Sequence, residues 1–402
     1  MKTLFPVICV FSCLISADLF AGRATSTIEA ATVTWALTQS MHSERSGDTA
    51  TLLPDGRVLA VGGITTGAAF PLYAELFDPV TDTWAETPSL GYGVIGHTAT
   101  LLPDGRVLIA GGITGLYSPP TTRCELYDPV FGTWSQTGDL NQARRLHAAT
   151  LLADGEVLVA GGEDDFGSDI ASSEIFDPAT GQWRLTGNLN VARKIYQAVR
   201  LQDGKVLVAG GFFKEASAEL YDPVTGLWTL TGSMKKGRTF FTLSLLNNGK
   251  ALAVGGSNSQ GLHVGNSAEL YDPTNGTWAS TGKLAVGHIQ HAATELLNGK
   301  VVVTAGKDVV DNTYTTVEIY DPTTEVWTSG GSTVNPHVLH TATRLQDGRI
   351  LITGRSGSVE RLRPRPYSGP RGFRRGPRRA PRRRPRQGHR SPAGCRHPPA
   401  PI

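Results

Sequence analysis

Short apolar runs recur along the chain in a fixed order, and each has the length of a β-strand. In one copy, residues 97–102 lead through Asp104-Gly105 into the apolar run 107–110, which ends at a Gly-Gly pair. After a variable stretch, residues 125–127 alternate polar with apolar and stop at Asp-Pro, and residues 133–135 follow. Such runs between turn residues are typical of strands. The pattern predicts four antiparallel strands per unit, the first two joined by a two-residue Asp-Gly hairpin.

The unit recurs at intervals of 45 to 50 residues, and tryptophan marks its end. A fixed period of this length indicates a repeat architecture, because one unit cannot bury its apolar face alone. Four-stranded units that stack side by side in a ring form a β-propeller. All the tryptophans of the chain fall in this register: Trp35, Trp84, Trp134, Trp183, Trp228, Trp278 and Trp327.

The Gly-Gly pair, followed at fixed spacing by a Tyr or Phe and then a Trp, resembles the kelch repeat over roughly residues 32–360. The phrases Asp-Pro-x-Thr-Gly-x-Trp and Leu-Leu-x-Asp-Gly look like the secreted bacterial branch of kelch and galactose-oxidase-like propellers. This resemblance implies an all-β propeller that binds a ligand or acts on a carbohydrate. The aromatic partners of the tryptophans are Phe77, Tyr127, Phe176, Tyr221, Tyr271 and Tyr320.

The number of turns predicts seven blades. Asp-Gly or Asn-Gly turns begin at residues 55, 104, 154, 203, 248, 298 and 347, whereas Asp-Pro follows only six of the predicted third strands. Trp35 has no Asp-Pro before it, yet residues 35–41 match residues 228–234 in register. We therefore predict that an N-terminal strand around Trp35 is the outer strand of the last blade, which hides a sheet edge and closes the ring.

Composition divides the chain into three predicted segments. Residues 1–24 contain an apolar run after Lys2 and small residues beyond it, as in a cleaved secretory signal; an uncleaved anchor and a lipoprotein signal are the alternatives. Residues 25–360 form the predicted propeller. Residues 361–402 contain 14 Arg and 10 Pro, and this composition is typical of a disordered segment. The tail gives residues 355–402 a net charge of +14, whereas residues 1–354 carry −11.

The tail begins abruptly where a third strand of the last blade is expected. Ser358-Val359-Glu360 starts the Glu-Leu-Tyr-Asp-Pro pattern, and the sequence then changes to Arg and Pro. A frameshift product, a solvated linker and a basic arm that binds nucleic acid are the three interpretations. The absence of Lys and the onset within a strand favour the frameshift, so nucleic acid is not an expected partner.

Two sets of positions lie just before each innermost strand and form a predicted collar at the mouth of the central channel. Arg offers a planar donor group for anions, and His can donate, accept or ligate a metal. Repetition in several blades favours a scaffold role instead, because one site does not need several copies. The candidate ligand-binding residues are Arg45, His97, Arg144, His147, Arg193, Tyr196, Arg238, His288, His291, His337 and His340.

The sequence favours a binding module over an enzyme. The galactose-oxidase-like resemblance implies a copper site of two Tyr and two His, with one Tyr joined to a Cys, but Leu339 stands where a Tyr is expected and Cys124 has no matching context. We expect no catalytic residue, metal or cofactor. The predicted protein is a secreted or cell-envelope monomer, without a membrane span in its mature form, that binds a protein or a glycan. An exported sugar mutarotase or galactose-oxidase-like enzyme is the alternative.

Overall fold

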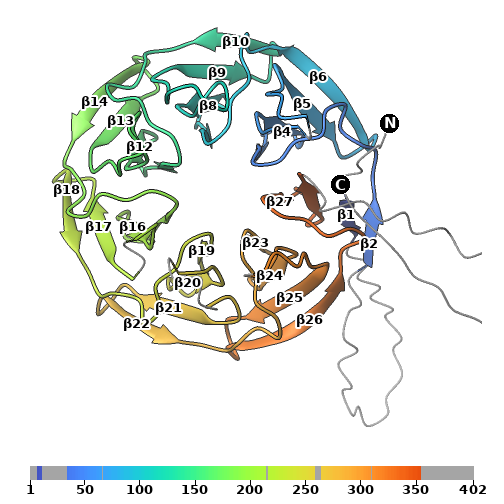
Figure 1. Ribbon diagram of the computed structural model, residues 1–402, viewed down its shortest axis with the longest axis vertical. Coiled ribbons are helices and arrows are strands. Elements are labelled where there is room, and N and C mark those ends of the chain that lie inside the picture. The colour runs from blue at the N-terminus through green and yellow to red at the C-terminus, as the bar shows by residue number, and fades with distance from the viewer. Residues whose placement is uncertain are drawn as a thin grey trace, which may run out of the picture. The chain divides into compact units, whose positions relative to one another are not determined.

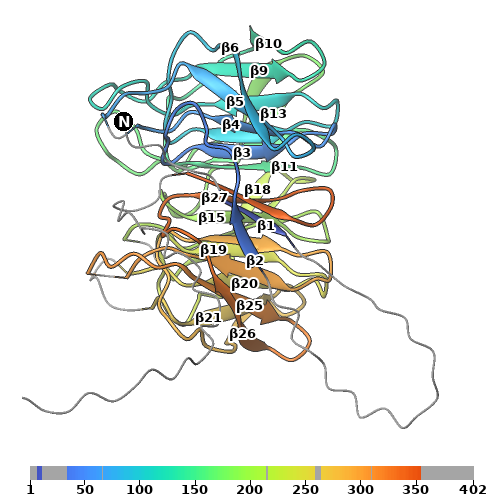
Figure 2. The ribbon, with the colours of Figure 1, turned by 90° about the vertical axis from the view of Figure 1, so that its right-hand side faces the viewer.

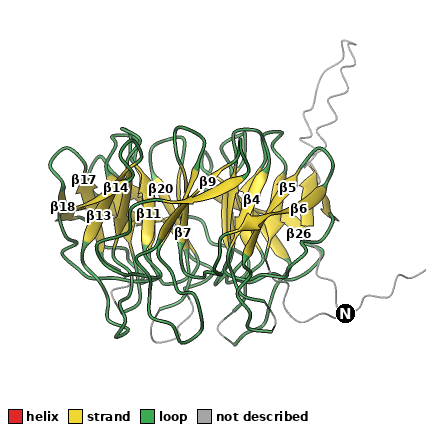
Figure 3. Ribbon diagram, turned by 90° about the horizontal axis from the view of Figure 1, so that it is seen from above, coloured by secondary structure: helices red, strands yellow, loops and turns green. Residues whose placement is uncertain are grey.

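The computed structural model describes residues 7–10, 34–65, 67–213, 216–258, 264–308 and 310–354. Every regular element in these ranges is a β-strand, and the strands form four-stranded antiparallel sheets arranged around a central channel (Figure 1). Seen from the side, loops and turns gather on the two faces of the ring and the strands lie between them (Figure 3). The predicted all-β propeller is confirmed.

Six blades are each built from four consecutive strands, which run from the channel to the rim. The innermost strands are β3 (Thr49–Leu52), β7 (Thr98–Leu101), β11 (Ala148–Leu151), β15 (Gln197–Arg200), β19 (Thr242–Leu245) and β23 (Ala292–Glu295). The second strands are β4 (Val58–Val61), β8 (Val107–Ala110), β12 (Val157–Ala160), β16 (Val206–Ala209), β20 (Ala251–Val254) and β24 (Val301–Thr304). The third strands are β5 (Tyr73–Asp78), β9 (Cys124–Asp128), β13 (Ser173–Asp177), β17 (Ala218–Asp222), β21 (Ala268–Asp272) and β25 (Thr316–Asp321). The outer strands are β6 (Thr83–Ser89), β10 (Thr133–Gln136), β14 (Gln182–Thr186), β18 (Leu227–Leu230), β22 (Thr277–Ser280) and β26 (Val326–Ser332).

A further sheet combines strands from both ends of the chain, which lie side by side in Figure 2. Its order is β2-β1-β28-β27, and its members are β1 (Val7–Val10), β2 (Thr34–Leu37), β27 (Thr341–Arg344) and β28 (Ile350–Thr353). The third position is thus held by β1, which belongs to the predicted signal peptide. The seventh blade and its closure stay predictions, because the strands of this sheet are not consecutive in the chain.

The turn between the first two strands is longer than the sequence indicated. The amide of Leu102 donates to the carbonyl of Arg106 (2.8 Å), and the amide of Gly105 donates to Leu102 (3.0 Å), so three residues connect the paired positions. Only Gly105 has a positive φ, of 88°, whereas a two-residue type I′ turn would also need one at Asp104. The predicted two-residue hairpin was therefore wrong: Asp-Gly marks the end of a three-residue loop.

The apolar core lies between neighbouring blades. In one cluster Leu59 and Val61 of the first blade pack with Val107 and Ile109 of the second, and all four are almost fully buried. Each second strand is buried along its whole length because it has a blade on both sides. Burying one such aliphatic side chain contributes about 1.5–3 kcal/mol, so the stacking of blades supplies much of the stability.

Gly111 should be essential to the contact between the second and third blades. A Cβ there would lie 2.6 Å from the carbonyl oxygen of Arg144 and 2.9 Å from Cε1 of His147. Gly132 has nearly the same φ (66° against 65°), but no atom lies within 4 Å of such a Cβ. Alanine at Gly132 would therefore introduce the backbone strain without the steric clash. We expect Gly111→Ala to lower the unfolding free energy by about 2–4 kcal/mol, and Gly132→Ala by about 1 kcal/mol. Equal losses in urea denaturation would contradict the packing argument.

Candidate functional site

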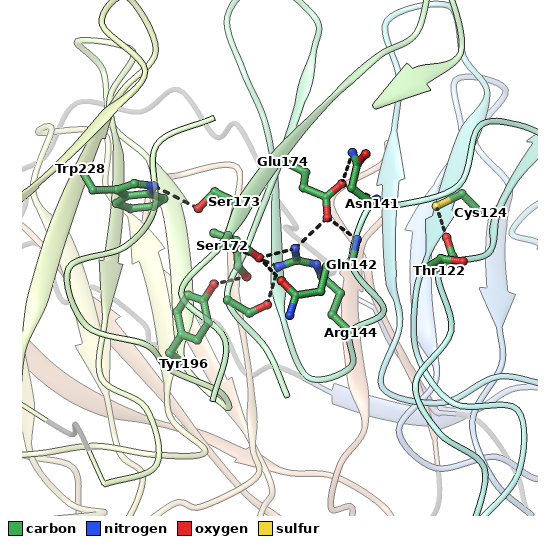
Figure 4. A network of polar contacts seen from close by, with 12 residues as sticks. Thr122, Cys124, Asn141, Gln142, Arg144, Ser172, Ser173, Glu174, Tyr196 and Trp228 are labelled. Atoms are coloured by element: carbon green, nitrogen blue, oxygen red, sulfur yellow. Dashed lines mark hydrogen bonds and ion pairs between the residues drawn. The ribbon is translucent and has the colours of Figure 1, made fainter. Parts of the chain in front are cut away.

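Four arginines of the predicted collar lie inside the blades. In the third blade Arg144 donates from Nη2 to Glu174 on β13 (2.8 Å) and from Nη1 to the carbonyl of Gly161 (2.7 Å), as Figure 4 shows for the acidic partner. Neither side chain of this pair has any exposed surface. The same pair, at 2.7 to 2.9 Å, joins Arg45 to Glu75, Arg193 to Glu219 and Arg238 to Glu269.

In five blades the third-strand glutamate also accepts hydrogen bonds from the backbone that enters its blade. The amides of Asn141 and Gln142 donate to Glu174 at 2.7 and 3.0 Å (Figure 4). The carboxylate thus has a cation and two amide donors, which offset much of the cost of burying the charge. This network fixes the connection between the outer strand of one blade and the innermost strand of the next.

In two blades a residue other than the collar arginine contacts the third-strand glutamate. His288 replaces the arginine in the sixth blade, where its Nε2 lies 3.2 Å from Glu318. In the second blade Val94 holds the cation position, and Arg123 on the adjoining loop donates from Nε to Glu125 instead (3.0 Å). An arginine or a histidine therefore contacts the third-strand glutamate in all six blades built from consecutive strands.

The collar histidines nearest the innermost strands connect neighbouring blades. Nε2 of His97 lies 3.0 Å from the hydroxyl of Thr49, which starts the innermost strand of the preceding blade. His147 and His291 form the same contact with Thr98 and Thr242 at 3.1 and 3.0 Å. In the sixth blade Ala292 replaces this threonine, and His340 contacts Thr304 on β24 instead (2.9 Å).

Burial keeps these imidazoles neutral at physiological pH. Desolvation lowers the pKa of His97 to about 4 and holds those of His147, His291 and His340 well below the usual value. Asp48 occupies the equivalent position in the first blade and accepts a hydrogen bond from Thr353 (3.0 Å). Desolvation raises the pKa of this carboxyl to about 6, and nearby Arg45 opposes that rise.

The channel is hollowed into a cavity of about 550 Å³. Its polar lining comes from Asp48, His97, His147, Tyr196 and Gln197, together with threonines that include Thr341. The rest of its wall consists of small alanine side chains. The cavity therefore offers hydroxyl, imidazole, amide and carboxyl groups around a space that could hold a small polar molecule.

A family model described as Kelch motif matches residues 97–141, 144–190 and 290–333. The chain is a β-propeller that carries Kelch motifs. A fungal alcohol oxidase of the AA5 family, solved in complex with copper, is similar at 16% identity over 78% of this chain and 74% of that one, with a TM-score of 0.65. YjhT is similar at 15% identity over 72% of this chain and 99% of that one, with a TM-score of 0.57. A search of curated proteins gives no significant match. At these identities the structural likeness shows the fold alone.

The residues of the predicted collar fall into three groups according to where the structure places them. In the first group, Arg45, Arg144, Arg193 and Arg238 form ion pairs within blades, and His288 contacts Glu318 at the equivalent position. None of these five side chains has exposed surface. The expectation that guanidinium groups line the channel mouth is corrected, because the third-strand carboxylates draw them into the blades. His291, His337 and His340 are buried near their blade junctions, outside the cavity lining. His97, His147 and Tyr196 line the cavity, and for them ligand binding stays a prediction.

Sequence reasoning missed the glutamate partners and part of the cavity wall. A signal for the partners was present, since a glutamate follows the collar arginine or histidine by 26 to 31 residues in five blades. Gln197 and Thr341 line the cavity but lie one position beyond the predicted collar. No local pattern distinguishes them from other strand residues.

Three exposed aromatic side chains lie on the loops that connect second to third strands. Tyr117, Phe166 and Phe213 are 99%, 91% and 68% exposed, and they belong to the second, third and fourth blades. These loops lie on the face where the innermost strands begin, which is also the face of the collar. The aromatic groups therefore flank the blades that supply His97, His147 and Tyr196 to the cavity.

Two further findings concern only the described residues. No group of three or more His, Cys, Asp or Glu is placed to hold a metal ion. No helix in those ranges is long and apolar enough to cross a membrane.

Proposed function

We propose that this kelch propeller is a binding module that holds a neutral glycan at the channel mouth. The cavity of about 550 Å³ carries the proposal, because its polar groups both donate and accept hydrogen bonds. Sugar hydroxyls need this mixture, and the side-chain amide of Gln197, which both donates and accepts, can supply it. The alanines leave space for a sugar ring near the innermost strands.

The exposed aromatic side chains support a glycan that extends beyond the cavity. Tyr117, Phe166 and Phe213 could stack against the apolar faces of sugar rings, because most of each side chain is exposed. They come from variable loops on a repeated scaffold, which is where binding residues concentrate.

Charge favours a neutral ligand over an acidic one. Residues 1–354 carry a net charge of −11, and Asp48 adds a negative charge to the cavity above pH 6. The guanidinium groups that would attract a carboxylate or phosphate are committed to glutamates inside the blades. A sialylated glycan should therefore bind more weakly than its neutral counterpart.

Sugar mutarotation is a second candidate, and Asp48 favours it. A carboxyl with a pKa of about 6 can both accept and donate a proton near neutral pH, as ring opening of a sugar requires. Asp48→Asn would separate the two functions: binding alone should survive the change, whereas proton transfer should stop.

We infer that the ring has seven blades and that β27 and β28 belong to the last. Leu345 and Leu351 pack with Phe77 and Trp84 of the first blade, as neighbouring blades do elsewhere. The amide of Gly47 donates to the carbonyl of Leu339 (3.0 Å), and Arg349 donates to Pro79 (2.9 Å). In this proposal β2, with Trp35, is the outer strand.

Export and a monomeric state complete the proposal. The sequence of residues 1–24 supports export, because an apolar run follows Lys2 and small residues end it. Apart from residues 7–10, this segment and the tail from residue 355 lie outside the described residues. A closed ring hides its sheet edges, which supports a monomer.

Gln197→Ala should weaken glycan binding without affecting stability. Gln197 lines the cavity and its side chain forms no hydrogen bond within the described ranges, so a lost contact to the ligand should lower affinity about tenfold. Gln202→Ala is the matched control, because Gln202 is exposed at the turn on the opposite face. The measurement is binding to immobilised neutral and sialylated oligosaccharides, with melting temperatures recorded in parallel. Absence of glycan binding by the unchanged protein, or equal losses in both variants, would reject the proposal.

A further inference from the structure

Seven equivalent residues surround the mouth of the channel, and each has a left-handed backbone with a φ between 51° and 70°. Each stands one position before Asp48 or its equivalent in another sheet. Backbone hydrogen bonds join neighbouring members: the amide of Gly47 donates to Leu339 (3.0 Å), and that of Leu146 donates to Gly96 (2.9 Å). We call these seven residues the channel rim; they are Gly47, Gly96, Leu146, Ile195, Phe240, Gln290 and Leu339.

Five rim positions carry a side chain although glycine would suit their backbone better. A left-handed φ is strained in a residue with a Cβ, above all in a β-branched one such as Ile195. The rim hydrogen bonds do not need these side chains, because Gly47 forms the same bond. The core does not need them either, since no apolar cluster of the described residues includes Leu146, Ile195 or Leu339. Strain that neither hydrogen bonding nor packing explains points to a function.

The two glycines of the rim form a gap beside the cavity. Each glycine directly precedes a residue of the cavity wall. Around the ring, Gly47 and Gly96 stand between Leu339 and Leu146, whose side chains are 44% and 36% exposed. The rim therefore has a stretch without side chains, and an exposed leucine borders it on each side.

The scaffold does not require glycine in this gap. A Cβ at Gly96 would lie 3.5 Å from Cδ2 of Leu146, which is an ordinary van der Waals contact. A Cβ at Gly47 would lie 3.2 Å from Cδ1 of Ile95, the end of a side chain that can shift. Since the other five rim residues carry side chains in the same conformation, the glycines are explained better by an approaching ligand, which glycine admits closest to the backbone.

We propose that the gap over Gly47 and Gly96 admits the ligand to the cavity and that Leu146 and Leu339 hold an apolar aglycone beside it. The ligand is then a neutral glycoside whose sugar occupies the polar cavity and whose apolar group lies on the rim. Polar groups in the wall and apolar groups at the mouth match the two parts of such a molecule. The ligand class rests on the proposed glycan binding, whereas the gap as an entrance does not.

Labelling of a cysteine inside the cavity tests the entrance without any glycan. Thr51 lines the cavity and is close to cysteine in volume, so Thr51→Cys in the full chain is the reporter. We expect Gly96→Leu in this background to slow labelling of residue 51 by N-ethylmaleimide at least about tenfold, because leucine fills the gap. Mass spectrometry of the peptide that contains residue 51 would give the rate.

Gln290→Leu is the matched control for the entrance. It places the same side chain at the rim position of a sheet that does not line the cavity, so labelling should keep its rate. Leu146→Ala widens the gap and should speed the labelling, so the test does not depend on the folding of one variant. Equal rates in Gly96→Leu and Gln290→Leu, or slower labelling in Gln290→Leu, would overturn the entrance.

Paired glycosides test the apolar part of the ligand. Methyl and 4-nitrophenyl glycosides of glucose, galactose, mannose and N-acetylglucosamine differ within each pair only in the aglycone. For the sugar that binds, we expect the 4-nitrophenyl glycoside to bind at least about tenfold more tightly, because the rim removes apolar surface from water. Replacing Leu146 and Leu339 together with Ser should abolish this difference and leave binding of the methyl glycoside intact.

Leu185→Ser is the matched control for the rim leucines, because Leu185 is 65% exposed on the outer strand β14 and should not affect either glycoside. Equal affinities for the two glycosides, or a difference that persists in the double rim variant, would overturn the assignment of the aglycone. If the unchanged protein binds no glycoside, the proposed function fails together with the ligand class, while the labelling rates still decide the entrance.

Discussion

Glu174→Ala should destabilise the protein by about 3–5 kcal/mol. The change leaves the fully buried guanidinium of Arg144 without its counter-ion, and the amides of Asn141 and Gln142 lose their acceptor. Removing one partner of a buried pair is costly because the remaining charge stays desolvated. Urea denaturation of the two proteins would measure the difference.

An exposed ion pair provides the control. Arg184 contacts Glu156 through two short hydrogen bonds, but the arginine side chain is 53% exposed. Arg184→Ala should therefore cost at most about 1 kcal/mol. If Glu174→Ala and Arg184→Ala lowered the unfolding free energy by similar amounts, the buried ion pairs would stabilise the fold no more than an exposed pair does. The same reasoning predicts that replacing Arg144, Arg193 and Arg238 together with Ala would unfold the protein, whereas a collar that only binds ligand would lose binding with its fold intact.

The fold could be predicted from sequence because its information is local and repeated. The apolar run at 107–110, the polar alternation at 125–127 and Trp134 define one blade, and repetition removes the ambiguity that a single copy would have. The loop that contains Asp104-Gly105 was predicted to be one residue too short, because Asp-Gly occurs in both two-residue and three-residue loops. Only the φ of each residue distinguishes them.

The site could be predicted only in part because its residues depend on stacking. Glu174 looks like an exposed residue in an alternating strand, yet the backbone entering its blade covers it completely. Arg144 looks like a channel residue, because the sequence places it near the innermost strand but does not show which way its side chain points. The cavity position of Gln197 requires several blades in their final arrangement, and no sequence pattern within one blade contains that information.

Stability should fall steeply as the pH is lowered from 6.5 towards 4. His97, His147, His291 and His340 have pKa values below that of a free imidazole because burial disfavours their charged forms. In this range the unfolded chain binds protons that the folded chain does not, so protonation favours unfolding. Each histidine that differs in this way contributes a slope of up to about 1.4 kcal/mol per pH unit. The stability is fully present above pH 6.5 and is lost as the pH falls.

Asp48 should oppose this trend and therefore provides a test of its origin. Its pKa is raised to about 6 in the folded protein, so between pH 3.8 and 6 the folded state binds more protons through this carboxyl than the unfolded state does. Asp48→Asn should make the acid-side slope steeper by about one proton, whereas His97→Gln should make it shallower by a similar amount. Unfolding free energies from urea titrations at a series of pH values would give the slopes. An acid-side slope that His97→Gln leaves unchanged would show that the buried imidazoles do not determine acid stability.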